Sequence, residues 1–185
     1  MRLHPGAVSR RRPRRPGNVS SLAEAAAQAD ALAEAGDERA LSQLRAQWDE
    51  ELEHAARSSD YRDRAVAFRA IAQFRFRQKL ELLRRGLDDD SPAVRGSALV
   101  SVQALSKQSP GLVNSMRPLL HTLASSDPNQ AVRRLAIVCL RNGSAQRETI
   151  VLLNGLAEDD DEDAELRKTA RAVAADLKKR AGAKA

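Results

Sequence analysis

Apolar side chains recur at three- and four-residue spacing along most of the chain, as Leu41, Leu44, Trp48 and Leu52 illustrate. This spacing places them on one face of a helix. Turn signals such as Gly36 and Ser109-Pro110-Gly111 separate the periodic stretches. We expect helices over about residues 20–36, 37–57, 60–73, 92–107, 112–125, 129–141, 145–157 and 164–180, and one more that ends near Leu87. The pattern therefore predicts an all-helical chain.

One helical hairpin returns along the sequence. The apolar helix that ends near Leu87 runs into an acidic turn, and a second helix starts at Pro92 with an Arg in its first turns. Related segments follow, so that the Arg recurs at 95, 133 and 167, in steps of 38 and 34 residues. A period in this range with two helices per unit is typical of a stacked helical solenoid.

The repeated segments read Asp90-Ser91-Pro92-Ala93-Val94-Arg95-x-x-Ala98, then Asp127-Pro128 through Val132-Arg133-x-x-Ala136, then Leu166-Arg167-x-x-Ala170. Over about residues 41–180 the chain resembles HEAT repeats of the short bacterial kind, whose first helices often carry a proline kink such as Pro118 would make. The resemblance implies an all-α, right-handed α-solenoid of about four antiparallel helix pairs, a HEAT/armadillo-like superhelix. It also implies a structural ladder, in which turn acids and the following arginines bond across repeats; here these would be Arg95, Arg133, Arg167, Asp90 and Asp127.

The repeats predict a division of the chain. Residues 1–19 form an Arg- and Pro-rich arm that we expect to be disordered, residues 20–57 form N-terminal helices that cap the solenoid, residues 58–180 form the repeats, and residues 181–185 form a tail. Arg64 takes the place of Arg95 in a degenerate first repeat, as terminal repeats often deviate.

A scaffold needs a surface, and the second helix of each pair offers one on the expected concave side. The residues one and eight positions after the Arg of the motif include Gly96, Gln103, Arg134, Arg141 and Lys168. Their basic stripe is interrupted, so scattered solvated charges are an alternative to a binding track. In Phe74-Arg75-Phe76-Arg77, two helical Phe would lie well apart, so we expect one in the core and one at a junction between repeats.

The formal net charge of +6 arises in the arm. Residues 1–19 contain six Arg and no acid, which leaves 25 basic against 25 acidic residues in the rest of the chain. Arg10, Arg11, Arg12, Arg14 and Arg15 could therefore bind an anion such as a nucleic-acid or ribosomal phosphate backbone. An organellar targeting segment, opposed by the prolines of the arm, and an over-extended gene start are further alternatives for these residues.

No motif for catalysis or for a cofactor is found. The three histidines, His4, His54 and His121, share no motif, and we expect no metal and no cofactor. The single Cys139 lies on an apolar helix face, which favours a small buried hydrophobe in a reducing compartment, and no apolar run is long enough to cross a membrane. We therefore expect a cytoplasmic, non-enzymatic scaffold or adaptor that binds a protein, with arm-mediated nucleic-acid or ribosome association as an alternative. A third interpretation, a HEAT-like bilin lyase subunit, rests on resemblance at the level of the repeat alone.

Overall fold

The computed structural model describes residues 21–183, and within this range the chain forms nine helices and no strand. The helices are α1 (Leu22–Ala35), α2 (Glu38–Ala55), α3 (Tyr61–Gln73), α4 (Leu80–Leu87), α5 (Pro92–Ser106), α6 (Pro110–Ser126), α7 (Gln130–Leu140), α8 (Arg147–Glu158) and α9 (Ala164–Gly182). The arginines of the predicted arm lie outside the described residues.

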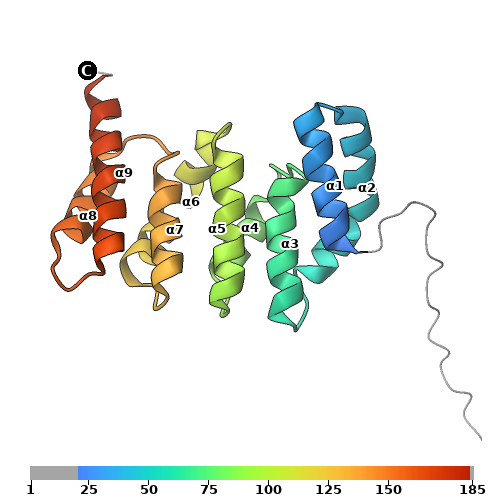
Figure 1. Ribbon diagram of the computed structural model, residues 1–185, viewed down its shortest axis with the longest axis horizontal. Coiled ribbons are helices and arrows are strands. Elements are labelled where there is room, and N and C mark those ends of the chain that lie inside the picture. The colour runs from blue at the N-terminus through green and yellow to red at the C-terminus, as the bar shows by residue number, and fades with distance from the viewer. Residues whose placement is uncertain (1–20, 184–185) are drawn as a thin grey trace, which may run out of the picture.

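The helices form two layers in an open row. Figure 1 shows α1, α3, α5, α7 and α9 side by side along the longest axis, with α2, α4, α6 and α8 behind them. Each front helix packs against the next, α1 on α3, α3 on α5, α5 on α7 and α7 on α9. Each of α3, α5, α7 and α9 also packs against the back helix that precedes it in the chain. We call these two sets the front layer and the back layer; the arrangement agrees with an α-solenoid.

α1 covers the N-terminal end of the row with small side chains. The hydroxyl of Ser21 accepts a hydrogen bond from the Glu24 N–H, and Gly36 ends the helix with a φ of 72°, a left-handed conformation that favours glycine. Ala25, Ala26 and Ala29 are buried, and α1 packs on both α2 and α3. Because alanine buries little area, α1 adds a thin layer to this end of the row.

Two glycines permit close approach between elements. A Cβ built on Gly86 of α4 would lie 2.5 Å from the Phe68 ring and 2.9 Å from the Ala98 Cβ. A Cβ on Gly143 would lie 2.7 Å from Val113. Both glycines are therefore required by contact between neighbouring helices. Gly143 does not adopt the left-handed conformation of a glycine C-cap, because Gly36 is the one glycine with positive φ within residues 21–183.

The prediction for the two phenylalanines was wrong. Phe74 and Phe76 lie in the connection between α3 and α4, where Arg75 adopts a φ of 57°. The reversal at Arg75 brings both rings into the core, with centroids 5.4 Å apart. The helical spacing that would separate the rings does not apply, because α3 ends at Gln73. Pro118 lies inside α6, which runs as one helix from Pro110 to Ser126.

Candidate partner-binding groove

Buried ion pairs join successive helix pairs. Nε and Nη2 of Arg95 on α5 donate to both carboxylate oxygens of Asp127, in the turn before α7, at 2.7 and 2.9 Å. The side chain of Asp127 is 2% exposed and that of Arg95 10% exposed. Nη1 of Arg95 donates to the Asp89 carbonyl at 2.8 Å, so the same guanidinium also holds its own turn. A bidentate pair with this much burial fixes both distance and orientation between the two units.

Bidentate pairs also join the units one step earlier and one step later. Arg64 donates to both carboxylate oxygens of Asp89 at 2.8 and 2.9 Å, and Arg133 donates through Nη1 and Nη2 to the two carboxylate oxygens of Glu162. Burial alone would raise the pKa of Asp89, but the hydrogen bonds from Arg64 and from the Ser91 N–H outweigh it and hold that pKa below its usual value. We call Arg64, Arg95 and Arg133, with their acids, the ladder.

Asp89 and Glu162 were missed by the sequence analysis. The side chain of Asp90, expected in the ladder, is 91% exposed and accepts a single bond from Arg64. A register signal was available for Asp89, which precedes Arg95 by six positions just as Asp127 precedes Arg133. Glu162 precedes Arg167 by five, because the last turn has a different shape.

Small polar side chains add a second repeated contact between front helices. The Ser101 hydroxyl donates to the Phe68 carbonyl at 2.5 Å, and the Cys139 thiol donates to the Leu99 carbonyl at 3.3 Å. Ser101 and Cys139 each follow their ladder arginine by six positions, and both acceptors follow theirs by four. Burial raises the pKa of Cys139 to about 12, so the thiol stays protonated and acts as a packing group.

An apolar groove of about 460 Å³ crosses the exposed side of three front helices. α3 contributes Ala65, Val66 and Arg69, α5 contributes Pro92, Ala93, Gly96, Ser97 and Val100, and α7 contributes Leu135. Val66 is 40% exposed. The front layer therefore presents apolar side chains to solvent at consecutive units. Gly96, which has no side chain, leaves room for the groove between them.

The charge of the groove lining is positive. Arg69 is the one charged lining residue, and neither α5 nor α7 contains an acidic residue. The exposed guanidinium of Arg69 has no ion-pair or hydrogen-bond partner within residues 21–183. A groove with an apolar floor and an unpaired cation at its side fits an apolar side chain that is followed or preceded by an acid.

The predicted surface residues are distributed differently. Of the five, Gly96 lies in the groove. Arg134 stands 3.9 Å from Asp163 across the α7–α9 junction, and Lys168 stands 3.9 Å from Glu165 on its own helix. Gln103 and Arg141 accept inter-helix bonds through their carbonyls, from Asn142 and from Arg180. Sequence reasoning missed Val66, Arg69, Val100 and Leu135, which lie two or five positions after a ladder arginine.

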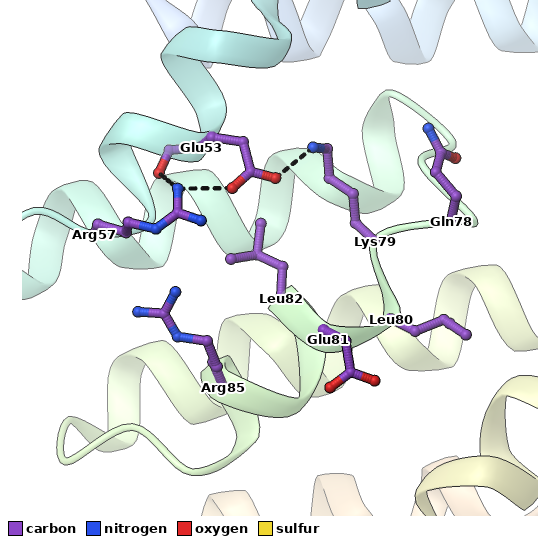
Figure 2. Close-up of a pocket in the computed structure, with 8 residues that line it drawn as sticks. All are labelled: Glu53, Arg57, Gln78, Lys79, Leu80, Glu81, Leu82 and Arg85. Carbon is purple, nitrogen blue, oxygen red and sulfur yellow. Dashed lines mark hydrogen bonds and ion pairs between the residues drawn. The ribbon is translucent and has the colours of Figure 1, made fainter.

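A second hollow, of about 510 Å³, lies between α2 and α4 in the back layer. Figure 2 shows Glu53 between Arg57 and Lys79, and Lys79 also bonds Asp49 at 2.8 Å. Burial alone would lower the pKa of Lys79, but the hydrogen bonds to Asp49 and Glu53 outweigh it and raise that pKa. Because its central charges satisfy one another, we interpret this cleft as a salt-bridged joint between α2 and the α3–α4 connection.

A buried polar cluster joins α6 to α8. Nη1 of Arg117 donates to the Thr149 hydroxyl at 2.8 Å, and Nε2 of His121 lies 2.9 Å from the same hydroxyl. That hydroxyl can donate to Nε2 or accept from it, depending on the tautomer of His121. Burial lowers the pKa of His121, an effect that Arg117 reinforces and Glu148 opposes. Within the described range no group of three or more His, Cys, Asp or Glu could hold a metal ion.

Trp48 has a mixed environment. The side chain is half-buried on α2 and packs against the core, but its buried Nε1 has no hydrogen-bond partner among the described residues. It therefore contributes packing area at the edge of the core.

The repeated ladder and the two-layer row are compatible with a HEAT-type helical repeat protein. The model of one family, non-SMC mitotic condensation complex subunit 1 (Cnd1), matches residues 64–158, from the first ladder arginine to the end of α8. The chain belongs to this family. No curated protein matches the chain. Among residues 21–183, no helix has the length and apolar character needed to cross a membrane.

Proposed function

We propose that this protein is a non-enzymatic HEAT-type scaffold that binds a segment of a protein partner in the groove formed by α3, α5 and α7. The observation that carries the proposal is the apolar groove lining formed by the exposed Val66 and the half-buried Val100 and Leu135, which continues across three consecutive units. A family of complex subunits supports a role in assembly. We further propose that the row is a right-handed superhelix of about four helix pairs, of the short bacterial kind.

The ladder supports this function through rigidity. A partner segment that spans several units gains affinity when the units already hold their bound spacing, because less conformational entropy is lost on binding. Buried bidentate pairs from Arg64 to Asp89 and from Arg95 to Asp127 fix that spacing on either side of α5. We therefore assign Arg64, Arg95 and Arg133 a framework role and the groove the binding role.

The groove chemistry defines the partner segment. It carries an apolar side chain that enters beside Gly96, and a carboxylate that reaches Arg69. Affinity should then fall moderately as salt rises, since a single exposed ion pair contributes about 1 kcal/mol or less.

The test uses the tagged full-length protein, purified from its native cell together with bound proteins. Gly96→Leu fills the groove floor, where a Cβ would lie 3.9 Å from the nearest Leu135 atom and so meets no clash. Ala46→Leu, at an exposed position of α2 in the back layer, is the matched control. We expect Gly96→Leu to reduce recovery of a specific partner at least tenfold while Ala46→Leu leaves it unchanged. Equal recovery with both variants would contradict the groove as the binding site.

Charge reversal gives a second readout. Arg69→Glu places an acid where the groove needs a cation, and Arg39→Glu makes the same change at an exposed position of α2. We expect loss of binding in the first variant alone. If the partner binds better after Arg69→Glu, the assigned charge of the partner segment is wrong.

The arm supports a second candidate function, association with nucleic acid or the ribosome. Six arginines without an acid in residues 1–19 give that segment the whole net charge of the chain. Cytoplasmic location stays a prediction from the single buried Cys139 and the absence of a long apolar run in the sequence. Deleting residues 1–19 separates the two functions, because a groove-bound partner should be retained without the arm.

A further inference from the structure

The ladder has a direction. In each pair the arginine belongs to the second helix of one unit, and the acid belongs to the turn of the next unit towards the C-terminus. Arg64 reaches Asp89, Arg95 reaches Asp127, and Arg133 reaches Glu162. Three consecutive pairs with the same sense define a rule for how a further unit would attach.

Arg167 occupies the ladder position of the last described unit. Its Nη1 donates to Asp160, an acid in the turn that precedes its own helix, and the side chain of Asp160 is 97% exposed. Nε and Nη2 of Arg167 have no hydrogen-bond partner among residues 21–183, whereas Arg64 and Arg95 use these two nitrogens to bind the next acid. Arg167 is 31% exposed, about three times as much as Arg95. At the C-terminal end of the row, Nε and Nη2 of Arg167 are therefore available to bind a further carboxylate.

The same end of the row exposes apolar surface in the back layer. Figure 1 shows α8 and α9 at one end, with α6 and α7 on the inner side. Thr149 of α8 faces α6, because it bonds Arg117 and His121. Val151 lies two residues further, about 200° around the helix, and therefore faces away from α6. It is 61% exposed, the most exposed large hydrophobic side chain among the described residues. Gly155 follows one turn later and leaves that face flat, with no atom within 4 Å of a Cβ built there.

We propose that the outer face of α8 and α9 is a second docking surface, for a helix pair of a partner protein whose interhelical turn presents a carboxylate to Arg167. The partner helices pack against Val151 and Gly155 in the way that successive back helices follow one another in the row. Inside the chain, an apolar contact and a bidentate Arg–carboxylate pair occur together at every junction from Arg64 onward. The outer face of α8 and α9 offers one half of the same combination.

A second copy of this chain does not match the outer face of α8 and α9. Six positions before Arg64, where the later units have Asp89 and Asp127, the first unit has Ser58. The Ser58 hydroxyl donates to Asp63, and its carbonyl accepts from Arg64. A head-to-tail copy would therefore offer Arg167 a hydroxyl in place of the required carboxylate.

The test is site-specific photo-crosslinking of the full-length protein in its native cell. A benzophenone amino acid replaces Val151, which is exposed enough to accept it, and the same amino acid at the exposed Ala46 of α2 is the control. Mass spectrometry of the product identifies the crosslinked peptide. We expect a peptide from a helix–turn–helix segment with Asp or Glu in its turn. We also expect Arg167→Gln to reduce its yield about tenfold, since the variant loses the charge-assisted hydrogen bonds to the partner carboxylate.

Three results would overturn the proposal. The first is no product from position 151 above the Ala46 control, the second is a product with another copy of this chain, and the third is a yield that Arg167→Gln leaves unchanged. Groove variants separate this site from the proposed function. Gly96→Leu should leave the crosslink at position 151 intact if the two surfaces are independent.

Discussion

Replacing Arg95 with Met removes one ladder pair together with the bonds that the guanidinium makes to the carbonyls of its own turn. The substitution keeps the aliphatic stem that packs on α5 and removes the guanidinium, which leaves the Asp127 carboxylate 2% exposed with the Asn129 N–H as its remaining donor. Breaking a buried ion pair by removing one partner costs about 3–5 kcal/mol. Arg167→Met is the matched control, because its partner Asp160 is 97% exposed and such pairs contribute about 0–1 kcal/mol.

A double-mutant cycle with Asp127→Leu separates the pair from its surroundings. Asp127→Leu also removes the bond to the Asn129 N–H, which costs roughly 1 kcal/mol by itself. The double variant buries no unpaired charge, so it should be more stable than the sum of the single changes predicts, by roughly 1–3 kcal/mol. Urea unfolding followed by far-UV circular dichroism gives these free energies, provided the m-values agree, since repeat arrays can unfold in steps. An Arg95→Met cost no larger than that of Arg167→Met, or a coupling energy near zero, would refute the framework role of the ladder.

Four further outcomes are expected. Gly86→Ala should lower the free energy of unfolding by about 1–3 kcal/mol, because the new methyl group overlaps the Phe68 ring. Gly155→Ala, on the open face of α8, should raise the free energy of unfolding by up to about 1 kcal/mol. Urea unfolding of both variants distinguishes the two signs. The lowered pKa of His121 means that the folded state prefers the neutral imidazole. The contribution of this group to stability should therefore be complete above pH 6.5 and fall as the pH drops below that value. In thermal melts at pH 5 and 7, His121→Gln should reduce the difference in stability between the two pH values. Cys139, with a pKa raised to about 12, should resist iodoacetamide in the folded protein and react after denaturation. If the arm binds nucleic acid, log affinity should fall with log salt at a slope of up to about 5, and a chain without residues 1–19 should lose that dependence.

The helices could be predicted from the sequence because the signal for each is local. An apolar stripe at helical spacing, such as Leu41, Leu44 and Leu52, must be buried on one side wherever the helix packs. Arg95, Arg133 and Arg167 were proposed for the ladder because their spacing repeats, but Arg167 bonds Asp160 in the turn before its own helix. The acids were harder to assign, because Asp88, Asp89 and Asp90 are consecutive and only the register of the turn decides which carboxylate faces the neighbouring guanidinium.

The connection after α3 and the groove depend on tertiary structure. The left-handed conformation of Arg75 brings Phe74 and Phe76 together. It could not be predicted from the sequence, because the position is not a glycine, the residue that usually indicates this conformation. The groove depends on which apolar residues the packing of α3, α5 and α7 leaves uncovered. Val66 and Val102 look alike in sequence, yet Val102 is fully buried between helices and Val66 is 40% exposed.

Footprinting of the purified complex with a photoactivated carbene tests the binding surface most directly. The reagent labels accessible side chains regardless of charge, so the free protein should be labelled at Val66 and the half-buried Leu135 in the groove and at the exposed positions 42, 43, 46 and 47 of α2. With the native partner bound, we predict that labelling of Val66 and Leu135 falls at least severalfold while labelling of these four α2 positions is unchanged. Protection of α2 with the groove still fully labelled would contradict a scaffold that binds through its front layer.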